Sequence, residues 1–219
     1  NIEGAIHVAK DNTTLRGNGN ATVLKRMYNS TATNEGSTAR GLITLNDKKG
    51  CRIENLYIDG NKNDYDYGDN CGIYMVSSSD NTITGNTCSD NGFGIYLSSS
   101  SDNNTITGNI CSGNSYYGIY LVFSSSNTVT GNTCNNSNYG IYLSSSSSNN
   151  ITGNICNSNS RSICLFSSSS NNTITGNTCN NNDYGIHLSS SSNNNITGNI
   201  CNSNSRGIYL SSSSSNTIT

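Results

Sequence analysis

The hydrophobic positions of this chain recur at a constant spacing over most of its length. A tetrapeptide of the form I/V-T-G-N begins at six positions that lie 23, 23, 22, 23 and 22 residues apart, namely Ile83, Ile106, Val129, Ile151, Ile174 and Ile196. A second run, G-I-Y-L or a close variant, recurs in step with it and begins at Gly72, Gly94, Gly118, Gly140, Ser162, Gly185 and Gly207. Spacing this regular indicates stacked structural repeats.

Each repeat predicts three short strands. In one copy they cover residues 105–107, 110–111 and 119–121, and Gly, Asn and Ser turn formers separate them. No run shows the 3.6-residue period over the length that a helix needs. Repeats of 22–23 residues with three short strands in register therefore predict an all-β fold, a right-handed parallel β-helix (solenoid). Successive coils would hydrogen-bond at a spacing of about 4.8 Å.

The repeats divide the chain into two parts of one continuous solenoid domain. Residues 1–71 carry an irregular version of the pattern, interrupted by two excursions at roughly 25–40 and 62–70 that we interpret as surface loops. Residues 72–219 carry the regular coils. The copies also alternate in detail, since the residue before each repeated Cys is Thr or Ile in turn, which suggests a unit of two coils.

Alternation of side chains along a strand assigns the faces. The repeated Ile or Val points inward, and so does a cysteine ladder formed by Cys88, Cys111, Cys134, Cys156, Cys179 and Cys201. These thiols could be reduced core residues, inter-coil disulfides or a soft-metal site such as Cu(I). Nine cysteines are an odd number, and Cys164, at an outward position, is the candidate for an exposed thiol.

The Asn that follows each I/V-T-G is expected to turn a corner of the coil. Asn tolerates left-handed backbone, and its amide can bond the equivalent amides above and below. The repeat predicts such a ladder at Asn86, Asn109, Asn132, Asn154, Asn177 and Asn199.

Aromatic residues recur at outward positions. One stripe contains Tyr74, Tyr96, Tyr120, Tyr142 and Tyr209, and it is interrupted by Cys164 and by His187, which we expect to be exposed. A second column precedes the repeated Gly and runs Phe93, Tyr117, Tyr139, Arg161, Tyr184 and Arg206. The stripes could simply suit strands, or they could form a platform for carbohydrate or a partner protein. Paired Thr residues on the I/V-T-G-N strand form another column, for which ice binding is a minor alternative.

Charge excludes some partners and suggests one metal site. Nine of the eleven Lys and Arg residues precede Cys71, so no basic stripe exists for nucleic acid. No apolar run approaches the roughly 20 residues of a membrane span. Carboxylates cluster only at Asp59, Asp64, Asp66 and Asp69, which could bind Ca²⁺ or form a solvated acidic loop. We expect no other cofactor, and no catalytic constellation is recognisable.

The repeats, together with T-T-L-R-G-N-G at residues 13–19, resemble the parallel β-helix repeats of pectin-lyase-like proteins and of NosD-type periplasmic or surface proteins. The resemblance covers nearly the whole chain and implies the β-helix fold. It implies less about function, because this architecture serves lyases, hydrolases, adhesins, tailspikes and envelope proteins. Pectin-lyase-like enzymes use clustered carboxylates, which the regular repeats of this chain lack.

We therefore expect a non-enzymatic structural rod that is extracellular or on the cell surface, as part of an envelope layer, sheath or filament. Its partners would be copies of itself, stacked end to end, or envelope components. The lack of an initiator Met and an end within a coil also suggest a piece of a longer protein. Two alternatives stay open, a carbohydrate-binding module that uses the Tyr stripe for polysaccharide, and a polysaccharide lyase or hydrolase with an acidic site at residues 59–69.

Overall fold

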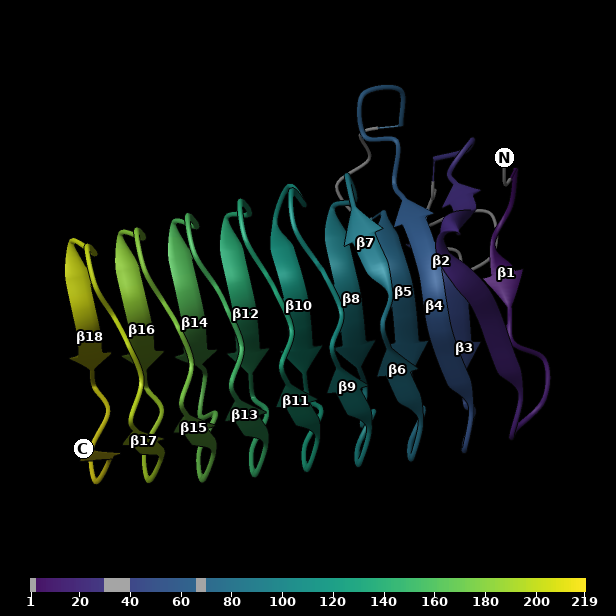
Figure 1. The fold of residues 1–219 in the computed structure, drawn as a ribbon. Helices are drawn as coiled ribbons and strands as arrows, with labels where there is room; N and C mark the ends of the chain where they lie inside the picture. Colours follow the sequence, from purple (N-terminus) through teal and green to yellow (C-terminus); the bar gives the residue numbers. More distant parts are fainter. Residues whose placement is uncertain (1–2, 30–39, 66–69) are drawn as a thin grey trace.

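The computed structural model describes residues 3–29, 40–65 and 70–219, and these wind into a stack of parallel coils (Figure 1). The strands of the described chain fall into two parallel sheets that run the length of the stack and face each other across a narrow core. The predicted all-β parallel β-helix is confirmed. No segment of the described residues forms a helix long and apolar enough to cross a membrane.

The first sheet, here called the long-strand sheet, contains nine strands among the described residues. In spatial order they are β1 (Ile6–His7), β3 (Gly41–Asn46), β5 (Cys71–Val76), β8 (Phe93–Ser98), β10 (Tyr117–Val122), β12 (Tyr139–Ser144), β14 (Arg161–Phe166), β16 (Tyr184–Ser189) and β18 (Arg206–Ser211). From β5 to β18 these are the G-I-Y-L runs of the sequence, extended by one residue at each end.

The second sheet, here called the short-strand sheet, contains ten described strands. They are β2 (Thr14–Lys25), β4 (Arg52–Asp59), β6 (Thr82–Thr84), β7 (Thr87–Ser89), β9 (Thr105–Thr107), β11 (Thr128–Thr130), β13 (Asn150–Thr152), β15 (Thr173–Thr175), β17 (Asn195–Thr197) and β19 (Thr217–Ile218). The third run expected in each coil is a strand only at β7. Beyond it the run is reduced to single bridges such as Thr87 to Ile110.

Equivalent residues of successive coils lie opposite one another. Ile119 on β10 pairs with Ile95 on β8 and with Ile141 on β12. The repeat length thus sets the register, since each coil must return the chain to the same place. Irregularity is confined to the first coils, where the pairing of β2 with β4 shifts register on either side of Gly19. The proposed division at residues 71 and 72 stays a prediction.

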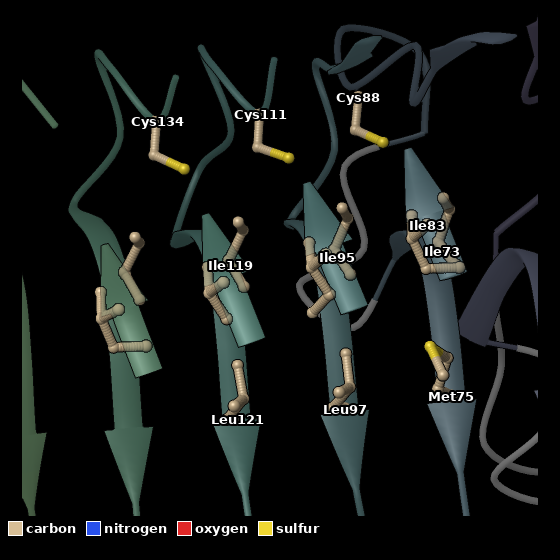
Figure 2. Close-up of a cluster of buried hydrophobic side chains, with 14 of the residues drawn as sticks. Ile73, Met75, Ile83, Cys88, Ile95, Leu97, Cys111, Ile119, Leu121 and Cys134 are labelled. Carbon is tan, nitrogen blue, oxygen red and sulfur yellow. The ribbon is translucent and has the colours of Figure 1, made fainter. Parts of the chain in front are cut away.

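The core is a single column of aliphatic side chains and thiols. The repeated Ile and Val residues are fully buried in the first five copies, and Ile196 is 1% exposed. Figure 2 shows Ile95 and Leu97 of β8 with Ile119 and Leu121 of β10 in matching positions, and Cys88, Cys111 and Cys134 in successive coils. Five of the six repeated cysteines are fully buried and Cys201 is partly buried. All nine cysteines of the chain lie in the described part, and none of them forms a disulfide.

The predicted asparagine ladder is present inside the corner of the coil. Asn109 donates from its amide Nδ2 to Oδ1 of Asn132 at 3.0 Å, and its backbone N–H donates to the same oxygen at 2.9 Å. Two more Asn columns and a Ser column, which we did not predict, bond in a related way at other corners. They contain Asn81, Asn104, Asn127, Asn149, Asn172 and Asn194, then Asn91, Asn114, Asn159 and Asn182, and finally Ser78, Ser101, Ser124, Ser146, Ser169 and Ser191.

Candidate functional site

The outer surface of the long-strand sheet is the most distinctive surface of the molecule, and we call it the aromatic face. Strands β8 to β18 present three outward residues each, the residue before the Gly or Ser, the Tyr position and the last residue of the strand. From β5 to β18 the strands of this sheet contain no Asp, Glu or Lys. Arg161 and Arg206 are their only permanently charged side chains.

The rings of the aromatic face stack on one another along the solenoid axis. Tyr96 and Tyr120 have ring centroids 4.8 Å apart with an angle of 9° between their planes, and Tyr117 and Tyr139 are 4.9 Å apart at 15°. Stacking of this kind hides the ring faces and leaves edges and hydroxyl groups toward solvent. A sugar could therefore contact the polar edges of these rings more readily than their faces.

Three expectations about this face are wrong. Tyr74 is only 3% exposed, and Cys164 and His187, which we expected to be exposed, are 0% and 8% exposed. Phe166 explains the burial of Cys164, because its ring contacts Tyr142 on one side and His187 on the other. Cys164 pairs in register with these same two residues and so lies beneath the ring. Burial raises the pKa of the Cys164 thiol above its ordinary value, which makes it a poor nucleophile.

The other Tyr residues of the predicted stripe are partly covered. Tyr96, Tyr120 and Tyr142 are half-buried, and Tyr209 is 38% exposed. Burial raises the pKa of Tyr142 to about 12, so its hydroxyl keeps its proton at neutral pH. These hydroxyl groups can therefore donate as well as accept hydrogen bonds.

Arginine and tyrosine alternate at the C-terminal end of the aromatic face, at the position before the Gly or Ser. The guanidinium of Arg161 lies 5.3 Å from the ring centre of Tyr139 and 5.2 Å from that of Tyr184. Arg206 lies 5.0 Å from Tyr184 and 5.2 Å from Tyr209. We call Tyr139, Arg161, Tyr184 and Arg206 the Arg–Tyr column. Cation–π contacts on both sides hold each guanidinium in place.

Hydrogen bonds orient the two guanidinium groups further. Nη1 of Arg161 donates to the hydroxyl of Tyr139 at 2.7 Å, and Nη1 of Arg206 donates to the hydroxyl of Tyr184. Within the described chain neither Arg forms an ion pair, and the Nη2 atoms make no hydrogen bond. Two oriented guanidinium groups without carboxylate partners have the chemistry to bind an external anion.

Buried polar atoms without partners lie beside this column. Among the described residues, Nε of Arg161 and Nδ1 of His187 are buried and accept or donate no hydrogen bond. Burial, with a smaller contribution from Arg161 and Arg206, lowers the pKa of His187 below its ordinary value. His187 is therefore neutral at neutral pH, and the charge of this region comes from the two Arg residues. Unpaired polar groups of this kind are uncommon in stable interiors and favour a functional role.

The acidic loop lies beside the other end of the aromatic face. The carboxylate of Asp59 accepts from the N–H of Asn61 at 2.8 Å and lies 3.9 Å from Nζ of Lys25. Asp64 is exposed in a turn, and Asp66 and Asp69 lie outside the described residues. The described part of the chain has no group of three His, Cys, Asp or Glu side chains that could hold a metal ion. The Ca²⁺ site stays a prediction.

Several solved structures share this fold. The periplasmic alginate epimerase AlgG matches at 20% identity with a TM-score of 0.68, over 80% of this chain and 45% of AlgG. The A-module of the mannuronan C-5 epimerase AlgE4 of Azotobacter vinelandii matches at 18% identity and 0.58, over 87% of this chain and 63% of the module. The enzymatically active domain of tailspike protein 2 of bacteriophage CBA120 matches at 14% identity and 0.65, over 99% of this chain and 37% of that domain.

The chain thus spans less than two thirds of each of these proteins. At such low identity the matches show a shared fold. A search of the curated proteins found no matching sequence. The expectation of a purely structural, non-enzymatic rod is nevertheless wrong, because the solved structures that share this fold include two alginate or mannuronan epimerases and an enzymatically active tailspike domain.

One protein family matches the sequence itself, and its description, periplasmic copper-binding protein (NosD), raises the question of copper. The described residues do not fit a copper site. They hold no cluster of three suitable ligands, and five of the six repeated cysteines are sealed in the core at 0% exposure. Cu(I) prefers thiolate and thioether ligands. Burial raises the pKa of Cys134, whereas hydrogen bonds from Cys134 and Cys88 lower the pKa of Cys111 to about 5, so the thiol column gives no uniform set of thiolates.

The family match lies on the coils. It covers residues 5–182 and, in a second alignment, residues 158–219, which together include the irregular first coils and every regular one. The common feature is thus the repeat that builds the core column and the asparagine ladder. By this match the chain belongs to the NosD family.

Proposed function

We propose that this protein binds an acidic polysaccharide along the aromatic face. The observation that carries the proposal is the Arg–Tyr column, in which two oriented guanidinium groups stand on strands that contain no carboxylate, although the exposed Asp183 directly precedes β16. A uronate carboxylate suits such a group, because guanidinium and carboxylate form two parallel hydrogen bonds. The neighbouring Tyr hydroxyl groups can bond sugar hydroxyl groups along the same surface.

The comparisons support the same substrate class and a place outside the cytoplasm. AlgG and AlgE4 are alginate and mannuronan epimerases, so their fold accommodates an acidic polymer. The family is described as periplasmic, and AlgG is periplasmic as well. We therefore place the protein in the cell envelope or outside the cell, with polysaccharide as its partner.

Binding is expected to depend on the two Arg residues. Wild-type protein should bind oligomannuronate and should not bind a neutral cello-oligosaccharide of equal length, as measured by isothermal titration calorimetry. Replacing Arg161 and Arg206 together with Ala should weaken binding by two orders of magnitude or more, because each charge-assisted hydrogen bond contributes about 1.5–3 kcal/mol. Added salt should weaken the wild-type interaction.

Arg16→Ala is the matched control, because it removes one positive charge from the short-strand sheet, where Arg16 pairs with Glu54. This variant should bind as the wild type does. The proposal fails if no acidic polysaccharide binds. It also fails if Arg16→Ala and Arg161→Ala weaken binding equally, because long-range charge alone would then account for the affinity.

A second candidate is processing of the polymer at the acidic loop, which the enzymes of the same fold favour. Lys62 anchors this loop to the coils, since its Nζ donates to the carbonyl of Gly113 at 2.6 Å and lies 3.4 Å from Asp90. The loop rejoins the sheet where the N–H of Phe93 donates to the carbonyl of Asn70 at 3.1 Å, at the edge of the aromatic face. The exposed Asp64 could thus reach a bound chain.

If the loop processes the polymer, the protein should cleave or epimerise a polyuronate. Chromatography of the products and proton NMR would detect either reaction. Asp64→Ala should abolish turnover while binding and the melting temperature stay at wild-type values. Absence of turnover on mannuronate, guluronate and galacturonate polymers would exclude this candidate and leave binding unaffected.

A further inference from the structure

We infer that the Arg–Tyr column recognises a repeating polymer in register, with Arg161 and Arg206 binding acid groups on every second sugar of an extended chain that runs along the solenoid axis. This inference rests on the proposed function and assigns the spacing of the two Arg residues as the determinant of specificity.

Three positions of the later coils alternate with a period of two coils. Arg161 and Arg206 lie on β14 and β18, and Tyr184 on β16 occupies the coil between them. The same alternation appears on the short-strand sheet, where Asn150 and Asn195 take the place of Thr on β13 and β17. The alternation appears again at the residue before each repeated Cys, which forms a single β-bridge to the next coil. Ile and Thr alternate at this position, as Ile110, Thr133, Ile155, Thr178 and Ile200, and the three Ile side chains are exposed.

The structure keeps this spacing rigid on the aromatic face. Tyr184 lies between the two guanidinium groups and contacts both of them, at 5.2 Å and 5.0 Å from its ring centre. The two Arg residues are two coils apart, which is about 10 Å at the interstrand distance of parallel sheets. An external ligand therefore meets two fixed cationic groups in a line parallel to the axis. Preorganisation of this kind removes the cost of ordering two long side chains on binding.

A polysaccharide with two-fold screw symmetry matches that line. Each pyranose ring in an extended, diequatorially linked chain advances by a distance similar to one coil. Successive sugars turn opposite sides toward the protein, so the same acid group faces the surface at every second sugar. A chain with one carboxylate on each sugar thus presents carboxylates at a spacing of two coils. When one carboxylate binds one Arg, the next carboxylate that faces the protein lies beside the second Arg. The effective concentration of this second carboxylate is thereby raised.

The uncharged side chain of Tyr184 between the two Arg residues is part of the match, and the exposed Asp183 precedes it on the same coil. The sugar above Tyr184 turns its acid group away from the protein, so a cation at that coil would face no carboxylate. The hydroxyl of Tyr184 already accepts a hydrogen bond from Arg206. A surface that attracted polyanions by charge alone would bind them more tightly with a cation on every coil. This surface instead has Tyr184 on the coil between the two Arg residues.

Two variants with the same composition and the same charge test the spacing. In the first, Tyr184→Arg with Arg206→Tyr brings the two Arg residues to adjacent coils. In the second, Tyr139→Arg, Arg161→Tyr, Tyr184→Arg and Arg206→Tyr move the pair by one coil and keep the two-coil spacing. Both residue types already occupy this column, so both variants should fold, which circular dichroism and the melting temperature will verify.

The readout is the dissociation constant for a mannuronate octasaccharide at fixed salt. The adjacent-coil variant should bind at least tenfold more weakly than the wild type, because only one carboxylate can then be engaged at a time. The shifted variant should stay within about threefold of the wild type. Equal affinity of the adjacent-coil variant and the wild type would overturn the register and leave acidic polysaccharide binding in place. A shifted variant as weak as the adjacent-coil variant would also overturn it. A wild type that binds no acidic oligosaccharide would overturn both proposals.

Discussion

Replacing Asn132 with alanine should lower the melting temperature by roughly 5–20 °C, because two buried backbone groups lose their only side-chain partner. Oδ1 of Asn132 accepts from the backbone N–H of Asn109 at 2.9 Å, and Nδ2 of Asn132 donates to the carbonyl of Ile106 at 2.9 Å. Each unsatisfied buried group costs about 1–3 kcal/mol, so the loss of stability should be about 2–6 kcal/mol. Thermal unfolding followed by circular dichroism measures it.

The loss should be large for a single polar side chain because water cannot replace it. Asn132 is 0% exposed, and its neighbours in the ladder, Asn109 and Asn154, are 1% and 0% exposed. The amide of Asn132 also links these two coils through bonds of 3.0 Å on each side. Removing it interrupts the contact between three successive coils, and stability in a solenoid depends on such contacts between neighbours.

Asn138→Ala is the matched control, because Asn138 is an exposed residue in the same coil as Asn132. It should change the stability by less than about 0.5 kcal/mol. If Asn132→Ala were equally mild, the ladder would be a consequence of the fold that contributes little to it. If both variants lost several kcal/mol of stability, the coil would be sensitive to the loss of any Asn, and the ladder would have no special role.

The sequence predicts much of this fold because a repeat constrains each position many times. The inward direction of Ile106 and its equivalents followed from alternation, and the corner role of Asn109 and its equivalents followed from the I-T-G-N pattern. The columns that begin at Asn81 and Asn91 repeat just as regularly, but they stand among other Asn and Ser residues. From the sequence alone, the Asn whose side chain points into the core could not be told from the exposed Asn and Ser residues beside it.

Exposure was harder to predict than direction. Alternation correctly gave an outward direction to Cys164 and His187, yet both are buried. The reason is lateral packing, because Phe166 lies two residues further along the same strand and covers the space left by the small Cys. Such cover comes from single residues that depart from the repeat, and a repeat pattern carries no information about them.

The candidate site depends on the same kind of departure. Arg161 and Arg206 were visible as interruptions of an aromatic column. Their cation–π contacts with Tyr139 and Tyr184, however, join residues 22 or 23 positions apart in the chain and appear only after the coils are stacked. The acidic loop, by contrast, attracted attention as a cluster of carboxylates in sequence. Its described residues Asp59 and Asp64 do not converge on one point with other ligands.

Gly118→Val is expected to destabilise the protein by about 3 kcal/mol or more, or to prevent folding, because the inner surface of β10 has no room for a branched side chain there. A Cβ atom on Gly118 would lie 2.6 Å from the carbonyl oxygen of Gly140 and 2.9 Å from the Cβ of Cys134. The first of these atoms belongs to the backbone of the next coil and the second to the buried thiol column. Neither can move without changing the distance between coils.

Gly118→Ser provides the control, because the equivalent position on β14 is Ser162, which is fully buried. The stack therefore accommodates one small side chain when both adjacent coils carry Gly, as Gly140 and Gly185 do. Gly118 has the same Gly neighbours in Gly94 and Gly140, so the Ser variant should fold and lose less stability than the Val variant. Urea denaturation of the two variants compares them. Equal stability would mean that the coils can separate to admit a branched side chain, and close packing against the thiol column would then not explain the repeated Gly.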